Sequence, residues 1–341
     1  MNRLGSLLAV TSILIAACRS APAASPVPAT GAPPATAAAA RPAWALAVHG
    51  GAGVIPKTMD AAVRAEYVAA LEGALAHGRD LLAAGGSSLD VVEAVVRRLE
   101  DDPHFNAAKG AVYTHEGRHE LDAAIMDGRT LAAGAVTGVT TVAHPISLAR
   151  LVMERSPHVL LAGEGAEKFA AEQGMERVDN HSFDTERRYQ QWQEALEKER
   201  QAAAAKEHGT VGAVALDRDG NLAAATSTGG LTNKSWGRVG DTPIVGAGTY
   251  ANNSTAAISC TGTGELFIRH TVAHDVSALM EYKGMTVQEA ADAVIHGKLK
   301  PGNGGLIAVA HDGSIALVFN SEGMFRGAAD STGRFAVAIW E

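Results

Sequence analysis

The sequence is poor in cysteine, in aromatic residues and in positive charge. Its 341 residues include only two cysteines, Cys18 and Cys260, which excludes a zinc site built on cysteine pairs and a disulfide framework. Aromatic residues make up 5%, and the net charge is -8. A mildly acidic protein gains nothing from neutralising phosphates, so we expect no nucleic acid partner.

Glycine and small apolar residues are abundant instead. The sequence holds 37 glycines, and hydrophobic residues make up 47% against 19% charged, which is the balance of a globular domain with a sizeable core. The length suits one large domain or two modest ones. The many glycines favour tight turns and close approaches of the backbone.

The first residues predict an export signal. Arg3 precedes an apolar run at 7–17, which has the length of a signal-peptide core and is too short to span a bilayer. The run ends in Ile-Ala-Ala before Cys18, which resembles a bacterial lipobox. We therefore expect residues 1–18 to direct export to the periplasm, with Cys18 lipidated as a membrane anchor. A plain signal peptide cut near Ala24 is the alternative.

Residues 19–41 predict a flexible tether. They are rich in Ala, Pro, Ser and Thr and contain no large apolar side chain beyond Val27. Such a segment cannot bury enough surface to fold. We expect the folded domain to begin at about residue 42.

Apolar spacing in the folded domain predicts strands, then helices, then strands again. The spacing predicts helices at 61–84, 144–154, 264–282 and 286–297, a helix capped at Ser87, and hairpins at 210–227 and 305–319. The charged stretch 185–207 lacks an apolar stripe, so we expect a solvated arm there. This order of elements indicates packed layers of sheet and helix.

The segment His208-Gly209-Thr210 carries the main chemical signal. A threonine hydroxyl is a weak nucleophile and needs a base. Cleavage before Thr210 would give this residue a free α-amine, which titrates near ~7.7–8.0 and can accept the hydroxyl proton. Gly209 would permit a strained backbone and attack on its carbonyl. On its own, this segment is better explained as an ordinary glycine before a strand.

Six segments in the same order resemble the plant-type isoaspartyl peptidase/L-asparaginase family of N-terminal-nucleophile hydrolases. They lie at 49–53 (HGGAG), 120–128, 156–170, 209–233, 237–251 and 259–265 (SCTGTGE). The resemblance implies an α+β fold, the four-layer αββα sandwich. It also implies self-cleavage between Gly209 and Thr210.

The cleavage divides the folded domain into two subunits. The α-subunit is expected at 42–209, with a flexible arm at about 176–209, and the β-subunit at 210–341. The resemblance further implies that two such αβ heterodimers associate.

The resemblance also implies roles for individual residues. Thr210 matches the nucleophile and Thr228 the second threonine that bonds to it. Thr261 and Gly262 match the oxyanion hole, where a hydroxyl and a backbone N–H suit a developing negative charge. The implied substrates are β-aspartyl (isoaspartyl) peptides and L-asparagine, which release aspartate through a β-aspartyl ester on Thr210.

A second group of residues matches the substrate clamp. Arg238 can fork onto the α-carboxylate of an aspartyl substrate, and Asp241 can hold its α-ammonium. The remaining substrate-binding positions that the resemblance implies are Val239, Gly240, Thr263 and Gly264.

No cofactor and no transition metal are expected, because the histidines show no ligand spacing with a carboxylate partner. His49 is better explained as a structural residue of the glycine turn than as a base. The family's sodium loop corresponds to residues 99–109, from Leu99 to Lys109. Ala108 stands there where the family usually has glycine, and it would cost stability if the position needs a positive φ. A structural sodium therefore stays open.

Two other functions remain as alternatives. A glycosylasparaginase would use the same chemistry on a substrate that carries a glycan. A catalytically silent, tethered binding protein could keep the fold, although the joint presence of Thr210, Thr228, Arg238 and Asp241 argues against it.

Overall fold

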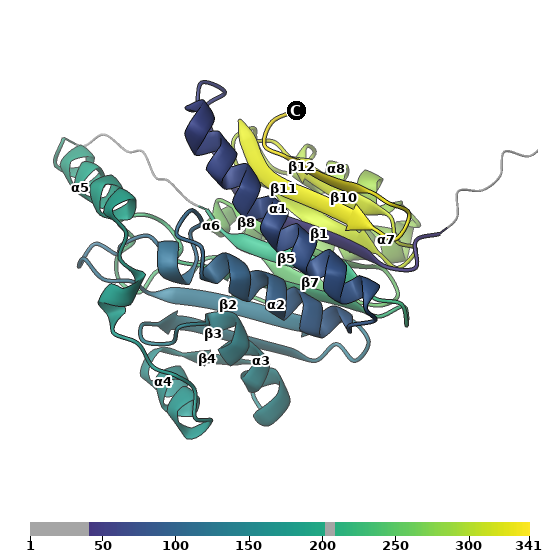
Figure 1. The fold of residues 1–341 in the computed structure, drawn as a ribbon, viewed down its shortest axis with the longest axis horizontal. Helices are drawn as coiled ribbons and strands as arrows, with labels where there is room; N and C mark the ends of the chain where they lie inside the picture. Colours follow the sequence, from purple (N-terminus) through teal and green to yellow (C-terminus); the bar gives the residue numbers. More distant parts are fainter. Residues whose placement is uncertain (1–40, 202–208) are drawn as a thin grey trace, which may run out of the picture. The chain divides into compact units, whose positions relative to one another are not determined.

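The computed structural model describes residues 41–201 and 209–341 (Figure 1). The predicted signal at 1–18 with Cys18, nearly all of the tether at 19–41 and His208 lie outside these residues. Within them, no helix combines the length and the apolar character needed to cross a membrane.

Two β-sheets form the centre of the folded unit. The strands of the larger sheet are β1 (Ala45–Gly53), β2 (Leu121–Asp127), β3 (Ala133–Val139), β4 (Leu160–Ala162), β5 (Val211–Leu216), β6 (Leu222–Thr228), β11 (Gly323–Asp330) and β12 (Phe335–Ala338). Their order is β12-β11-β1-β5-β6-β2-β3-β4, and all pairs are antiparallel except β3 with β4. The smaller sheet consists of β7 (Thr249–Ala251), β8 (Ala256–Gly262), β9 (Gly304–Ala310) and β10 (Ile315–Phe319), in the order β10-β9-β8-β7.

Helices cover the outer face of each sheet. The larger sheet packs against α1 (Ala61–Ala83), α2 (Ser88–Glu100) and α3 (Pro145–Arg155), and the smaller sheet packs against α7 (Val272–Lys283) and α8 (Val287–Ile295). The remaining helices are α4 (Gly163–Glu172), α5 (Glu186–Arg200), α6 (Gly264–His270) and the short 3₁₀ turns η1 (Ala108–Gly110) and η2 (Asn180–Phe183). The inner faces of the sheets contact each other through β1, β5, β6, β8 and β9. This layering confirms the expected αββα sandwich.

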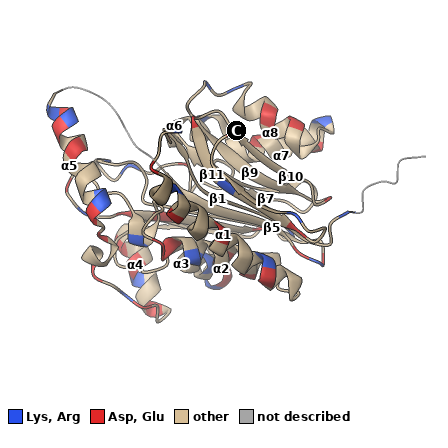
Figure 2. Ribbon diagram, turned by 45° about the horizontal axis from the view of Figure 1, so that its top comes forward, with Lys and Arg blue, Asp and Glu red and all other residues tan. Residues whose placement is uncertain are grey.

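The central strands are buried on both faces, as β5 illustrates. Successive side chains of a strand point to opposite sides. Ala213 and Ala215 therefore join the core under the helices, whereas Val214 and Leu216 join the core between the sheets. Charged residues lie mainly on the helices and loops (Figure 2).

The predicted helix at 264–282 is instead two helices. Thr271 has a φ of 48°, in the left-handed region, and this residue ends α6 before α7 begins. A threonine adopts this conformation only where the surroundings impose it, so the apolar spacing alone could not reveal the break. The cap at Ser87 and both hairpins are present as predicted.

The charged arm is helical and mostly exposed, and one side of it packs on the domain. Its first part forms α5, and Trp192 stacks on Tyr113 with ring centroids 5.3 Å apart. Arg188 donates from Nε to the carbonyl oxygen of Gly110 at 2.6 Å. Aromatic and arginine stems on one side of a polar helix thus fix it to the domain, although the helix has no continuous apolar stripe.

A buried acid joins the helix layer to the larger sheet. Oε1 of Glu100, at the end of α2, accepts hydrogen bonds from Ser227 Oγ in β6 at 2.7 Å and from the Ile146 amide in α3 at 3.0 Å. Its Oε2 has no hydrogen-bond partner among the described residues. Burial raises the pKa of Glu100 to about 8, against the opposing effect of these hydrogen bonds.

This raised pKa predicts a stability that depends on pH. An acid with a raised pKa in the folded state stabilises fully below its unfolded value of 4.5, and that stability is lost as the pH rises through about 8. In an uncleaved Thr210→Ala chain, Glu100 should contribute a fall in the free energy of unfolding of up to about 1.4 kcal/mol per pH unit between about pH 5 and pH 8. Denaturant titrations measure this slope.

Glu100→Gln should flatten the slope, because it removes the titrating group. Replacing the exposed Glu72 of α1 by Gln is the matched control and should leave the slope unchanged. An equal slope in Glu100→Gln and in the parent chain would contradict the assignment to Glu100.

Candidate active site

Thr210 lies immediately before β5 and next to the end of β6. The two strands pair with Val211 opposite Ser227, and continuing this register sets Thr210 beside Thr228. The Thr210 hydroxyl donates to Thr228 Oγ1 at 3.2 Å, and the Thr228 hydroxyl donates to the carbonyl oxygen of Gly209 at 2.9 Å. The pair of threonines therefore touches the peptide bond that the sequence marks for cleavage.

Asn106 is a second donor to that peptide bond. Its Nδ2 donates to the carbonyl oxygens of Gly209 and Gly230, both at 2.8 Å, while its Oδ1 accepts from the Val112 amide at 2.9 Å. The side chain is buried and held on both ends. Asn106 and Thr228 thus both donate to the Gly209 carbonyl and polarise it. Sequence reasoning missed Asn106, because its loop carried only a prediction of sodium binding.

The glycine turn at 49–53 packs against the same peptide bond. Gly51 has a φ of 112°, and a Cβ there would lie 3.2 Å from Gly209 Cα and 3.3 Å from the Thr210 nitrogen. A residue with a side chain would be strained by this backbone conformation and crowded by so close an approach, so glycine is required here. The HGGAG segment is therefore one wall of the site.

His49 orients the backbone of Thr210 and is not placed to take its hydroxyl proton. Its Nδ1 lies 3.1 Å from the Thr210 carbonyl oxygen, which can only accept, so Nδ1 carries the proton. Its Nε2 then accepts from the Ser259 hydroxyl at 2.9 Å. Burial lowers the pKa of His49 to about 3, so the ring is neutral at working pH. This geometry agrees with the structural role expected from the sequence.

Thr261 and Gly262 reach the site from the smaller sheet. Thr261 is fully buried, and its Oγ1 accepts a hydrogen bond from the amide of Ala52, the neighbour of Gly51, at 3.2 Å. The chain leaves β8 at Gly262, whose φ is 153°. Both residues therefore lie beside the glycine turn that contacts Thr210.

Arg238 and Asp241 converge on Gly264. A Cβ on Gly264 would lie 2.7 Å from Arg238 Nη2 and 2.9 Å from Asp241 Oδ1. Arg238 also donates from Nε and Nη2 to the two carboxylate oxygens of Glu265, each at 3.0 Å. Sequence reasoning missed Glu265, although it ends the SCTGTGE segment. The fork to Glu265 fixes the direction of the guanidinium.

Asp241 is the buried acid of this clamp. It is buried, and its Oδ2 has no hydrogen-bond partner among the described residues. Burial raises its pKa to about 7, although Arg238 favours the charged form. An aspartate in this state is suited to a cationic partner, because the partner would repay the cost of its ionisation.

The other predicted substrate-binding residues surround these two. Gly240 packs against the Arg238 guanidinium, with 2.9 Å between a Cβ at Gly240 and Arg238 Nη1. Val239 is partly exposed, and the Thr263 amide at the start of α6 donates to the Asn303 carbonyl at 2.9 Å. The structure brings the predicted site residues together, and their individual roles stay predictions.

Two cavities adjoin the site. One of about 310 Å³ reaches Gly209 and is lined by Gly51, Asn106 and Arg188 among others. The other, of about 470 Å³, is lined by polar and charged side chains that include Arg238. Helix α5 contributes Arg188 to the first cavity, so the predicted arm forms part of its wall.

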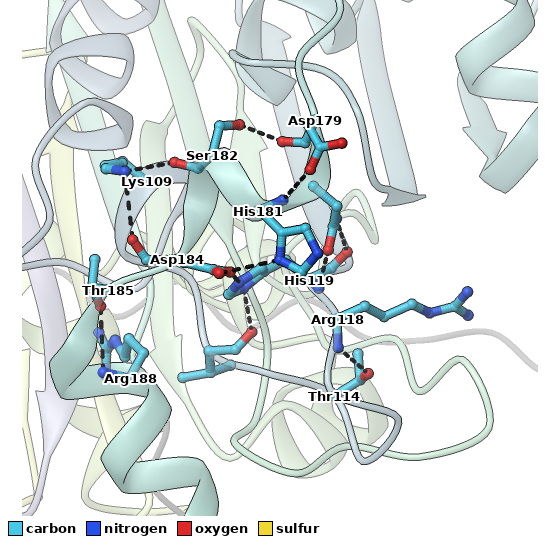
Figure 3. A network of polar contacts seen from close by, with 12 residues as sticks. Lys109, Thr114, Arg118, His119, Asp179, His181, Ser182, Asp184, Thr185 and Arg188 are labelled. Carbon is cyan, nitrogen blue, oxygen red and sulfur yellow. Dashed lines mark hydrogen bonds and ion pairs between the residues drawn. The ribbon is translucent and has the colours of Figure 1, made fainter.

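A polar network fixes the segment that leads into α5 (Figure 3). Asp184 accepts from His119 Nε2 at 3.0 Å and contacts His181 Nδ1 at 3.2 Å. Lys109 donates from Nζ to the Ser182 carbonyl at 2.6 Å. All these partners precede Gly209, so cleavage before Thr210 leaves the attachment of α5 intact.

No group of three or more His, Cys, Asp or Glu side chains within 41–201 and 209–341 could hold a metal ion. In the predicted sodium loop, Ala108 has a φ of 40°, the positive value at which alanine costs stability. The carbonyl oxygens of Phe105 and Pro103 lie close to Gly110, at 2.2 and 2.6 Å from a Cβ built there. These carbonyls leave no room for a side chain at position 110, and sodium binding stays a prediction.

Comparison with known proteins places the chain in a family. Residues 42–339 match the family model described as asparaginase. An isoaspartyl peptidase of Salmonella typhimurium is 56% identical over 292 residues, which cover 82% of this chain and 93% of the relative. The isoaspartyl peptidase of Escherichia coli is 53% identical over 295 residues, 82% of this chain and 91% of the relative.

A plant relative also covers most of the chain, at lower identity. A probable isoaspartyl peptidase/L-asparaginase of Arabidopsis thaliana is 47% identical over 324 residues, which cover 87% of this chain and 99% of the relative. These matches confirm the resemblance found in the sequence. The chain therefore belongs to the asparaginase family.

Proposed function

We propose that this chain is a self-cleaving threonine amidohydrolase that releases aspartate from β-aspartyl peptides and from L-asparagine. The observation that carries the proposal is the relay of hydrogen bonds from the Thr210 hydroxyl to Thr228 and from the Thr228 hydroxyl to the Gly209 carbonyl, beside the clamp of Arg238 and Asp241. Relatives named isoaspartyl peptidase or isoaspartyl peptidase/L-asparaginase support the substrate class.

Self-cleavage begins at the Gly209–Thr210 peptide bond. Thr210 Oγ attacks the Gly209 carbonyl carbon, and its proton passes to the departing Thr210 nitrogen through neighbouring groups. Asn106 Nδ2 and Thr228 Oγ1 donate to the carbonyl oxygen as negative charge develops on it. The acyl group thereby moves from nitrogen to oxygen. The shift frees the Thr210 α-amine, and water then hydrolyses the ester, which frees the Gly209 carboxylate and restores the Thr210 hydroxyl.

Substrate hydrolysis uses the new N-terminus. The α-amine of Thr210 takes the proton of its own hydroxyl, and Oγ attacks the side-chain carbonyl of the aspartyl substrate. Thr261 and Gly262 stabilise the oxyanion, and the leaving amine or ammonia departs with a proton. Water releases aspartate from the β-aspartyl ester and restores Thr210.

The clamp explains the preference for aspartyl groups. Arg238 binds the α-carboxylate of the substrate, while Glu265 accepts from Nε and Nη2 of the guanidinium and holds it in place. Asp241 binds the α-ammonium, whose positive charge lowers the pKa of this carboxylate from its raised value. A glycosylasparaginase would use the same clamp, and the relatives' names favour the peptidase.

Three further features belong to the proposal. The lipobox at Cys18 supports export to the periplasm and a lipid anchor, which fractionation of wild-type and Cys18→Ala cells tests. Exposed apolar side chains such as Trp236 support association of two αβ heterodimers, which sedimentation tests. The correspondence of residues 99–109 to the family's sodium loop supports a structural sodium, which a melting curve with sodium in place of lithium tests.

Thr210→Ala should give a single uncut chain without hydrolase activity. Both the acyl shift and substrate attack require this hydroxyl, which alanine lacks. Intact mass spectrometry and an asparagine assay check the two losses. Thr228→Ser, which keeps the second hydroxyl, is the control and should still cleave. Two fragments split before residue 210 in the alanine variant would sink the assignment.

Asn106→Ala should slow self-cleavage by about a hundredfold or more, because loss of one oxyanion donor typically costs ~10²–10³ in rate. Gel analysis of the precursor over time measures the rate. The melting temperature of the uncut precursor separates this effect from unfolding. A folded variant that matures at the wild-type rate would show that Asn106 does not assist the cleavage.

A further inference from the structure

Asp122 faces the catalytic side of the larger sheet. It lies in β2 directly opposite Thr228 of β6 in the antiparallel register. Leu121 and Ala123, its neighbours in β2, join the core under the helices. Because side chains alternate along a strand, Asp122 points between the two sheets, the side on which Thr228 contacts Thr210.

One oxygen of Asp122 has a structural role and the other has none. Oδ1 accepts from the Thr137 hydroxyl at 2.6 Å and from the Gly138 amide at 2.9 Å. Oδ2 is buried without a hydrogen-bond partner among the described residues, and the residue as a whole is 1% exposed. A buried carboxylate oxygen without a donor is costly. If Asp122 only held the backbone and hydroxyl at Thr137 and Gly138, its Oδ1 would be enough.

Asp122 shares a cavity with the substrate clamp. The cavity of about 470 Å³ is lined by Asp122 together with Lys234, Arg238 and Val239. Lys234 donates from Nζ to the Glu120 carbonyl at 2.8 Å and makes no hydrogen bond to Asp122 Oδ2. The unpartnered carboxylate therefore belongs to the wall of a space that the clamp arginine also borders.

Asp241, which lies with Arg238 against Gly264, shows the same state. Its Oδ2 also lacks a hydrogen-bond partner among the described residues. Burial raises its pKa, and the negative charges of Glu265 and Asp122 raise it further. Two buried carboxylates, each with one unpartnered oxygen, thus border the clamp.

We propose that Asp122 is a second binding residue for the α-ammonium of the substrate, which it shares with Asp241. An ammonium carries three donors, so it can serve both unpartnered oxygens at once. Its charge also offsets the repulsion between the two carboxylates. The inference rests on the proposed function and deepens it, because it adds Asp122 to the residues that select for the free α-amine of the substrate.

The test compares two competitive inhibitors of asparagine hydrolysis, L-aspartate and succinate. Succinate equals aspartate without the α-amine, so the ratio of their inhibition constants isolates the ammonium. The ratio is measured for matured wild type, Asp122→Asn, Asp241→Asn and Thr137→Val. Asparagine at position 122 keeps an oxygen for Thr137 and Gly138 while removing the charge. Thr137→Val removes a partner of Asp122 and leaves its charge.

Asp122→Asn should weaken aspartate binding by about tenfold or more, the usual value of a hydrogen bond to a charged group, and leave succinate within about twofold. Thr137→Val should shift both inhibitors alike. Equal weakening of both inhibitors by Asp122→Asn, or no change in either, would overturn the proposal. Should Asp122→Asn not fold, Asp122→Ser is measured in the same way.

The role of Asp122 and the clamp of Arg238 and Asp241 can be refuted separately. A ratio that falls in Asp241→Asn but not in Asp122→Asn refutes the role of Asp122 and leaves the clamp standing. A wild type that does not prefer aspartate to succinate refutes the clamp itself, and with it the proposed substrate class.

Discussion

The antiparallel pairing of β5 with β6 is the constraint on which the site depends. It sets Thr210 beside Thr228 and brings the Thr228 hydroxyl to the Gly209 carbonyl. The neighbours of this pair in the sheet complete the arrangement. On one side β1 supplies His49 and Gly51, and on the other β2 supplies Asp122. A slip of one residue between β5 and β6 would turn these side chains to the opposite face and dismantle the site.

The second sheet closes the site because the facing strands carry small residues. Gly212 in β5 leaves room for His49 and Ser259, since a Cβ there would lie 2.4 Å from His49 Nε2 and 2.1 Å from Ser259 Oγ. The hydrogen bond between Ala52 and Thr261 then ties β1 to β8 at the glycine turn. The abundance of glycine and alanine in the sequence therefore has a local purpose, which is to let two sheets and a cleavage peptide meet at contact distance.

Local patterns in the sequence predicted what depends on neighbours along the chain. The hairpin after Thr210 and the cap at Ser87 follow from strand alternation and from capping chemistry, and the layered fold followed from the family resemblance. The break at Thr271 was missed, because tertiary packing imposes its positive φ.

The polar partners in the site were harder to predict. Asn106 meets Gly209 across 103 positions of sequence, and Glu265 meets Arg238 across 27. No spacing rule links such residues, since only the assembled sheets bring them together. Asp122 lies inside segment 120–128, one of the six that resemble the family, yet its unpartnered oxygen is a property of the folded state.

We propose that the α-amine of Thr210 is the base in turnover. His49 is neutral and faces the backbone, and the raised pKa of Asp241 would appear in kcat/KM rather than in kcat, because bound ammonium keeps it ionised. The direct test is therefore kcat against pH for wild type and His49→Asn, whose amide can still donate to the Thr210 carbonyl. The account predicts that both enzymes lose kcat as the pH falls through the pKa of the amine, near or below ~7.7–8.0. An active His49→Asn enzyme without this acid limb would contradict it.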